Sequence, residues 1–340
     1  MHPATPCPSG TRLSICIATF NRAGALRATL ERLCAQITDE CEIIVADNAS
    51  SDDTKQVALE FAARVPQLRY IRHESNKGWE RNFHSAVCAA SGEYCWLMPD
   101  DDVLKSTGVS AVLTAIRPDY SLIIVNVEYV SNWDHTKVVI PCAMAVDSDR
   151  VYRRDETDRL FREVSEHMRY VGAVVIKRSI WLERAKEQYF ESWFVQVGVI
   201  FCAPLPGNTL VIREPQISVT LGGQRWLSES FDIFAYWWPL LVRTFPLSDE
   251  TKWRGCPELR SPGFFAFNRA CGQYSLLKYR RQIQPQLTRL RHRLLPLSVA
   301  LLPATVLNAL YAFFYRMRGR PGDQFMLQLL DRKNSSPSIH

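Results

Sequence analysis

Short apolar runs alternate with segments of helical period along the N-terminal third of the chain. The apolar runs predict buried strands over residues 13–20, 41–46, 68–72 and 94–98. Apolar residues recur at three- and four-residue spacing, which predicts helices, over 23–35, 55–64 and 79–90. Strands that alternate with helices in this way are typical of a parallel sheet with helices packed on its faces.

Polar residues follow at the end of each predicted strand. They comprise Thr19 with Asn21 and Arg22, Asp47-Asn48, Asn76-Lys77-Gly78 and Asp100-Asp101-Asp102. Because ligands of parallel sheets bind at the carboxyl ends of the strands, this pattern predicts one binding site built from these segments. The sequence contains neither GxGxxG nor GxxxxGK[ST], so a phosphate would be held by a metal ion and by side chains such as Lys77, Arg81 or Arg22.

Three consecutive aspartates end the fourth apolar run. Adjacent carboxylates repel one another, and a divalent cation would remove that repulsion. Mg²⁺ is usually held by one or two carboxylates together with the phosphates of a substrate. The alternative is that the aspartates cap a helix, which the pattern predicts over 103–116, although one Asp would suffice for that. This segment alone leaves both interpretations open.

The second half of the chain is less regular. The pattern predicts strands over 121–130 and 170–176, a loop region over 131–150 and a charged helix over 153–168. Ten cysteines are scattered without a CxxC pair or a Cys-His cluster, which favours buried thiols in a reducing compartment. Residues 1–10 lack the basic and apolar regions of a secretory signal, so we expect a cytoplasmic catalytic part.

Charge is distributed unevenly. Residues 252–340 carry 15 Lys and Arg against 3 Asp and Glu, a net charge of +12 within a chain of net charge +6. Residues 294–315 contain no charged residue and are flanked by arginines, but Pro296, Pro303 and Asn308 disfavour a spanning helix. We expect a shallow, interfacial or re-entrant membrane segment rather than a nucleic-acid partner. The alternative is a pair of helices packed on the catalytic domain.

Four segments carry a resemblance to a known family. LSICIATFNR (13–22), EIIVADNASSDDT (42–54), NKGWERN (76–82) and WLMPDDDVL (96–104) resemble the nucleotide-sugar-binding half of family 2 glycosyltransferases, which have the Rossmann-like GT-A fold. The resemblance covers about residues 11–200, and within the family it is greatest to bacterial O-antigen abequosyltransferase-like enzymes.

The resemblance implies a division of the chain. It places a GT-A domain with a mostly parallel, helix-flanked sheet at 11–250, with a donor-binding half at 11–120 and an acceptor-side half at 121–250. We expect a flexible N-terminus at 1–10, a helical and membrane-associated extension at 251–333 and a disordered tail at 334–340.

The resemblance also implies roles for single residues. Thr19, Asn21 and Arg22 match the loop beside the nucleotide, and Asp47 matches the acid that recognises the base, with Asn48 and Ser50 in the same motif. Lys77, Gly78 and Arg81 match the segment that closes over ribose and diphosphate. Pro99 stands where the family's Asp-x-Asp-Asp pattern begins. Asp102 is then our first choice as a direct ligand of Mn²⁺ or Mg²⁺ and Asp101 our second, with Asp100 and Asp101 near the donor sugar.

The remaining implied role is that of a general base. Glu191 falls where inverting members of the family carry this acid, although the usual Glu-Asp pair is Glu-Ser here. Its alternative role is a first-turn acid that suits a helix dipole, and Glu128 and Asp155 are fallback candidates for the base. One acid remote from the carboxylate cluster suits a direct displacement, in which metal and base lie on opposite faces of the sugar.

The implied activity is transfer of a sugar, which we expect to be a deoxyhexose, from a nucleotide-sugar donor. The acceptor would be a saccharide or a polyprenyl-diphosphate-linked saccharide of bacterial surface polysaccharide, at the inner leaflet of the membrane. A nucleotidylyltransferase is an alternative, but it would need a Gly-rich basic loop after the first strand. A non-catalytic, membrane-associated scaffold on a decayed transferase fold is another, and Pro99 and the lone Glu191 are its support.

Overall fold

The computed structural model describes residues 10–131, 137–221, 228–287, 289–320 and 322–331. They form two compact units, one that runs to Tyr129 and resumes at Ile140–Val219, and one formed by Val130–Val139 and the chain from Thr220 on. The expected boundary after residue 250 stays a prediction. The expected flexible and disordered segments lie outside the described residues, apart from Gly10.

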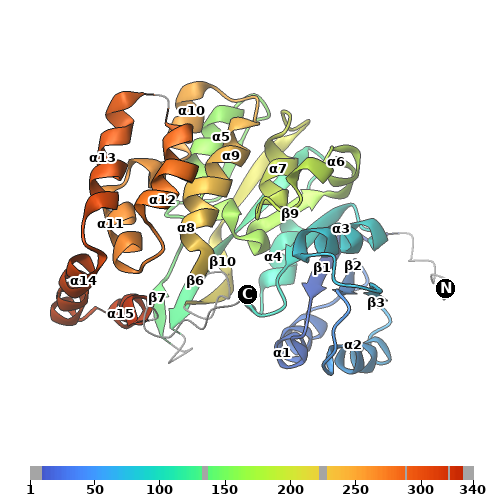
Figure 1. Cartoon of the computed structure of the whole chain (residues 1–340). Helices are drawn as coiled ribbons and strands as arrows, with labels where there is room; N and C mark the ends of the chain where they lie inside the picture. The colour runs from blue at the N-terminus through green and yellow to red at the C-terminus, as the bar shows by residue number, and fades with distance from the viewer. Residues whose placement is uncertain (1–9, 132–136, 222–227, 288, 321, 332–340) are drawn as a thin grey trace. The chain divides into compact units, whose positions relative to one another are not determined.

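Four parallel strands form the N-terminal part of the sheet. They are β1 (Leu13–Thr19), β2 (Cys41–Asp47), β3 (Leu68–Arg72) and β4 (Tyr94–Met98), in the order β3-β2-β1-β4. α1 (Ala23–Cys34) and α2 (Thr54–Ala62) lie on one face, and α3 (Trp79–Ala89) lies on the other (Figure 1). Since both faces are covered, β2 is buried along its whole length. The predicted α/β fold is confirmed.

The sheet continues beyond β4 with mixed strand directions. β9 (Val174–Lys177) runs antiparallel between β4 and β6 (Tyr120–Ser131), and β10 (Asn208–Leu221) follows β6. Short strands complete the sheet, namely β5 (Val103–Leu104), β7 (Val138–Ile140) and β8 (Arg150–Tyr152). The strictly parallel part, β1 to β4, is therefore the part that carries the polar strand ends.

The prediction of a helix over 103–116 was wrong at its start. Val103 and Leu104 form β5, which pairs with Ser218 and Ile217 of β10. Helix α4 (Gly108–Ala115) begins only afterwards, behind Thr107. The two apolar residues that follow the aspartates thus pair with β10, a distant segment of the chain. The aspartates therefore do not cap a helix.

Two further elements differ from their predicted extent. The predicted strand over 170–176 begins as a 3-10 turn, η2 (Val171–Ala173), before β9. Gly172 approaches the ring of Tyr170 so closely that a Cβ would lie 2.2 Å from the Tyr170 hydroxyl. The predicted helix over 153–168 is α5 (Thr157–Val164) followed by η1 (His167–Arg169), because the Glu156 side chain accepts from the Arg153 backbone in a turn that precedes the helix.

The rest of the described chain is helical. The first unit adds α6 (Arg178–Glu183), η3 (Glu187–Tyr189) and α7 (Val195–Phe201). The second unit contains α8 (Ser230–Asp232), the π-helix η5 (Ile233–Trp237), α9 (Trp238–Arg243), α10 (Asp249–Arg254), η6 (Pro257–Arg260), α11 (Pro262–Ala270), α12 (Leu276–Lys278), η7 (Tyr279–Ile283), η8 (Gln284–Gln286), α13 (Leu290–Leu301), α14 (Ala304–Arg318) and α15 (Asp323–Asp331).

Candidate active site

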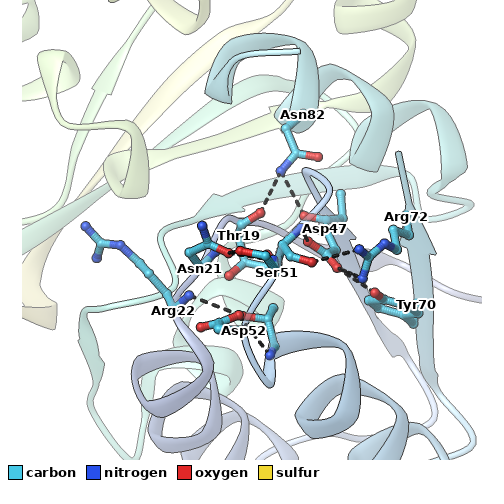
Figure 2. A network of polar contacts seen from close by, with 12 residues as sticks. Thr19, Asn21, Arg22, Asp47, Ser51, Asp52, Tyr70, Arg72 and Asn82 are labelled. Carbon is cyan, nitrogen blue, oxygen red and sulfur yellow. Dashed lines mark hydrogen bonds and ion pairs between the residues drawn. The ribbon is translucent and has the colours of Figure 1, made fainter. Parts of the chain in front are cut away.

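The carboxyl ends of the parallel strands meet at one edge of the sheet. Thr19, the last residue of β1, is in register with Asp47 of β2, and Asp47 is in register with Arg72 of β3. The Asn82 side chain of α3 donates hydrogen bonds to the carbonyls of Thr19, at 3.3 Å, and Ala46, at 2.8 Å, and so ties the two strand ends together (Figure 2).

The loop after β1 is fastened to the loop after β2. Asn21 adopts a left-handed conformation with φ of 52°, which Asn tolerates better than most residues. Its backbone N–H donates to Ser50 Oγ at 2.9 Å, and its Oδ1 accepts from the Ser51 N–H at 2.7 Å. The Arg22 N–H donates to Thr54 Oγ1 at 3.1 Å. Hydrogen bonds thus join the two loops into one platform (Figure 2).

Asp47 is fully buried, and protein donors reach both of its carboxylate oxygens. The Ser50 N–H donates to Oδ1 at 2.8 Å, while the Tyr70 hydroxyl, at 2.6 Å, and Arg72, at 3.2 Å, donate to Oδ2. Burial, together with Asp47, raises the pKa of Tyr70 to about 12. The sequence reasoning missed Tyr70 and Arg72, which occupy alternate positions of β3 and hence share one face of the strand.

The segment 76–78 is held by Asn48. Asn48 Oδ1 accepts from the Lys77 N–H at 2.8 Å, and its Nδ2 donates to Asn76 Oδ1 at 2.7 Å. Gly78 has φ of 84° and ψ of 156° at the start of α3, a conformation that is essentially restricted to glycine. Lys77 is exposed beside this turn. The geometry fixes the backbone of Lys77 and leaves its side chain accessible.

The three aspartates differ in environment. Asp100 and Asp102 are buried, whereas the Asp101 side chain is 45% exposed. The Arg22 guanidinium forms an ion pair with Asp101 and lies 3.6 Å from Asp100 Oδ1. Asp102 Oδ2 accepts from the Tyr170 hydroxyl at 2.6 Å. The triplet is thus joined to the loop after β1 on one side and to the segment before β9 on the other.

Burial makes two of these carboxyl groups weaker acids than an exposed aspartate. It raises the pKa of Asp100 to about 6 and that of Asp102 to about 7, and the charge of Asp101 acts in the same direction on both. Asp100 Oδ2 is buried and has no hydrogen-bond partner among the described residues. A nearby cation would favour the charged form of both groups.

The donor set fits a divalent cation that also binds phosphate. Within the described ranges, no three His, Cys, Asp or Glu side chains are grouped as a complete metal site. Mg²⁺ needs only one or two protein carboxylates when substrate phosphates supply further oxygens. The buried carboxyls of Asp100 and Asp102, with one oxygen of Asp100 unpartnered, meet that requirement.

Glu191 lies in the loop before α7, which begins at Val195. The alternative that Glu191 is an acid of the first helical turn was therefore wrong. Its side chain is 82% exposed and forms an ion pair with Arg81 at 3.2 Å. The Arg81 guanidinium also stacks over the Phe190 ring at 4.6 Å. Among the described residues, no hydrogen bond or ion pair joins this Arg81–Glu191 pair to the aspartate triplet.

Glu80 is a site residue that the sequence reasoning missed. It is buried at the start of α3, and one of its oxygens accepts from the backbone N–H of Glu191. Burial raises the pKa of Glu80 to about 7, against the opposing effect of the backbone amides of Glu191, Trp193 and Val195. Glu191 and Trp193 both have positive φ, of 71° and 70°. Glu80 therefore anchors the loop that carries Glu191.

The fallback candidates for a base have other partners. Glu128 pairs with Lys105 at 2.8 Å and accepts from Ser218, and although its partial burial acts in the opposite direction, these contacts lower its pKa. Asp155 pairs with Arg153 at 3.1 Å on an exposed turn. Neither residue contacts the strand-end cluster through these bonds.

Comparison with known proteins relates this geometry to a family. Residues 14–181 match the family described as Glycosyl transferase family 2. An uncharacterised protein of Mycobacterium tuberculosis is 40% identical over 92 residues, which are 26% of this chain and 27% of that protein. GalNAc(5)-diNAcBac-PP-undecaprenol beta-1,3-glucosyltransferase of Campylobacter jejuni is 32% identical over 111 residues, 32% of this chain and 36% of that enzyme. Abequosyltransferase RfbV of Salmonella typhimurium is 32% identical over 105 residues, 30% of this chain and 32% of that enzyme. The matches thus span 27–36% of these relatives' lengths.

Solved structures resemble the chain along nearly its whole length. S. aureus TarS 1–349 in complex with UDP-GlcNAc has a TM-score of 0.55 at 14% identity and covers 97% of this chain and 93% of its own. The mannosyltransferase PcManGT of Pyrobaculum calidifontis, in complex with GDP-Man and Mn²⁺, has a TM-score of 0.56 at 13% identity and covers 98% and 90%. These likenesses confirm the predicted GT-A fold.

Proposed function

We propose that this chain, whose residues 14–181 are a family 2 glycosyltransferase domain, transfers a sugar from a nucleotide-sugar donor to a saccharide acceptor. The observation that carries the proposal is the pair of buried carboxyl groups, Asp100 and Asp102, beside Arg22 at the carboxyl edge of the parallel strands. Such an edge is where open α/β sheets bind their ligands.

The donor would lie along the platform formed by the strand-end loops. Thr19, Asn21 and Arg22 would border the nucleotide, with Asp47 and Asn48 beneath it. Because protein donors already occupy both oxygens of Asp47, this residue would act by holding the loop that contacts the base. Lys77, Gly78 and Arg81 would close over the ribose and the diphosphate, where Lys77 offers an accessible ammonium group.

The diphosphate leaving group calls for positive charge. Mn²⁺ or Mg²⁺, held by Asp102 with Asp101 or Asp100, would supply Lewis-acid stabilisation of that charge when bound. Arg22 lies against Asp100 and Asp101, and its guanidinium would orient these carboxylates and bind a phosphate oxygen.

Glu191 is our candidate for the general base. Its carboxylate would accept the proton of the acceptor hydroxyl while the new glycosidic bond forms and the bond to the nucleoside diphosphate breaks, which inverts the anomeric carbon. The side chain is 82% exposed, so an acceptor can reach it, and Arg81 orients it. Glu80 fixes the backbone from which it projects.

We further propose a deoxyhexose donor and a lipid-linked saccharide acceptor in bacterial surface polysaccharide (O-antigen) synthesis. The similarity to an abequosyltransferase and to an enzyme named for an undecaprenol-linked substrate supports this choice. The enzyme would act from the cytoplasm, bound peripherally or inserted shallowly at the inner membrane.

Calorimetric titration with nucleotide sugars and Mn²⁺ tests the proposal. We expect binding that Arg22→Ala weakens and that Arg27→Ala, at an exposed arginine of α1 paired with Glu60, leaves unchanged. Absence of binding for every nucleotide sugar would favour the non-catalytic scaffold instead. Binding of a nucleoside triphosphate with release of pyrophosphate would favour a nucleotidylyltransferase, although no Gly-rich loop follows β1.

A further inference from the structure

Helices α13 and α14 carry exposed apolar stripes. On α14 the stripe consists of Val306, Leu310, Phe313 and Met317, at the spacing of one helix face. On α13 and the turn after it, it consists of Leu290, Leu294, Leu301 and Leu302. Together with Phe314, these side chains are 44–72% exposed. Single exposed apolar residues are ordinary, but stripes on two consecutive helices indicate an interaction surface.

The opposite face of α14 is already packed. Leu307, Tyr311 and Tyr315 lie against Phe267 of α11 and against α15. Asn308 donates hydrogen bonds to the carbonyls of Ala270, at 3.2 Å, and Leu330, at 3.1 Å. The helix is therefore apolar on both sides, although within the described part of the chain only one side has a protein neighbour. A helix that is apolar all round is typical of a buried or lipid-contacting position.

Charge around the stripes has one sign. Residues 290–320 contain no acidic residue, and arginines stand at both ends, at 289, 291, 293, 316, 318 and 320. Arg316 is exposed beside Met317, and Arg320 is exposed just after the helix. Arg318 is engaged by Asp323 of α15. Positive charge at the rim of an apolar surface complements anionic lipid headgroups.

Among the described residues, α13 and α14 have the length and composition to cross a bilayer only when they are taken together as a bent pair. Among the described residues no single helix is long and apolar enough to cross a bilayer, and His292–Leu301 and Ala304–Arg318 are bent by 92° relative to each other. α14 has 15 residues and is about 22 Å long, less than the roughly 30 Å of a bilayer core.

We propose that the outer faces of α13 and α14 bind the interface of an anionic lipid bilayer, with the apolar stripes in the headgroup–acyl boundary and the arginines at the phosphates. This inference rests on the membrane contact included in the proposed function and assigns that contact to named residues, and vesicle binding measures it without the transfer reaction. A second copy of the chain suits the surface less well, because self-association would bring the arginines of two copies together without acidic partners in this segment.

Co-sedimentation of the full chain with vesicles tests the inference. We expect binding to phosphatidylcholine vesicles that contain phosphatidylglycerol, and weaker binding to phosphatidylcholine alone. The double variant Leu310→Ser/Phe313→Ser should lower the partition coefficient at least about tenfold. Arg316→Gln and Arg320→Gln should each lower it about fivefold, and only with anionic vesicles. Leu59→Ser, at an exposed leucine of α2, is the matched control.

Three results would overturn the inference. They are no vesicle binding by the unmodified chain, unchanged binding by Leu310→Ser/Phe313→Ser, and a dimer that this variant dissociates while vesicle binding persists. Light scattering after size exclusion detects the dimer. Calorimetric binding of nucleotide sugars to the same preparations, without vesicles, decides the proposed function separately, so that failure of either proposal is recognised on its own.

Discussion

Replacement of Glu80 by glutamine gives a pH-dependent change in stability whose size follows from the structure. Burial raises the pKa of Glu80 from its ordinary value of 4.5 to about 7. Because its pKa is raised in the folded state, Glu80 is favoured there in its neutral form. Its stabilising contribution to the free energy of unfolding is therefore fully present below about pH 4.5 and is lost as the pH rises through about 7. The difference corresponds to about 3 kcal/mol.

Glutamine has the same shape but stays neutral. The free energy of unfolding of Glu80→Gln, relative to the unmodified chain, should therefore rise by up to about 3 kcal/mol between about pH 5 and pH 8. The raised pKa values of Asp100 and Asp102 affect both proteins equally and cancel in this difference. Urea denaturation at several pH values measures it, and Glu74→Gln, at an exposed glutamate, controls for loss of a charge.

A difference that is constant across this pH range would refute the reasoning, because it would mean that Glu80 titrates as an exposed acid. Glu80→Ala supplies a second readout. It leaves the backbone N–H of Glu191 without its acceptor, at a cost of about 1–3 kcal/mol, and should release the loop. If Glu191 is the base, kcat should fall while KM for the donor changes little.

Three further predictions concern the carboxyl edge of the parallel strands. Asp102→Asn should lower transfer at least about a hundredfold in a radiolabelled-sugar assay, and full activity would remove this residue from the site. Because burial raises the pKa of Asp100 to about 6 and that of Asp102 to about 7, protons compete with a cation, so Mn²⁺ affinity measured by calorimetry should increase from about pH 5.5 to pH 7.5. Gly78→Ala should lower the free energy of unfolding by about 1–3 kcal/mol in urea, since alanine does not tolerate φ of 84° with ψ of 156°, and a neutral effect would contradict the conformation described.

Local pattern was sufficient to predict the N-terminal, parallel part of the fold. β1 to β4 and the helices between them follow from apolar runs and helical spacing, and the carboxyl ends of parallel strands necessarily share an edge. Proximity of Thr19, Asp47 and Asp100 to one another could be anticipated for that reason. The family resemblance added the roles proposed for these residues.

Contacts between distant segments could not be anticipated from local pattern. Local pattern predicted that a helix begins at Val103 and Leu104, because their strand-pairing partners, Ser218 and Ile217, lie more than a hundred positions away. Glu80 contacts the backbone of Glu191 across 111 positions. No periodicity encodes such a pairing, so the anchoring role of a buried acid in α3 emerges only from the folded chain.

The position of Arg22 limits how the aspartate triplet could be transferred to another protein. The guanidinium lies beside Asp100 and Asp101, and the Arg22 backbone donates to Thr54, the first residue of α2, directly after the loop that follows β2. An engineer who grafted only residues 99–102 onto a different sheet would introduce three repelling charges without their counter-charge. A transplant would therefore need, besides Tyr170 that donates to Asp102, the triplet together with both loops, which come from segments some fifty to eighty positions earlier in the chain.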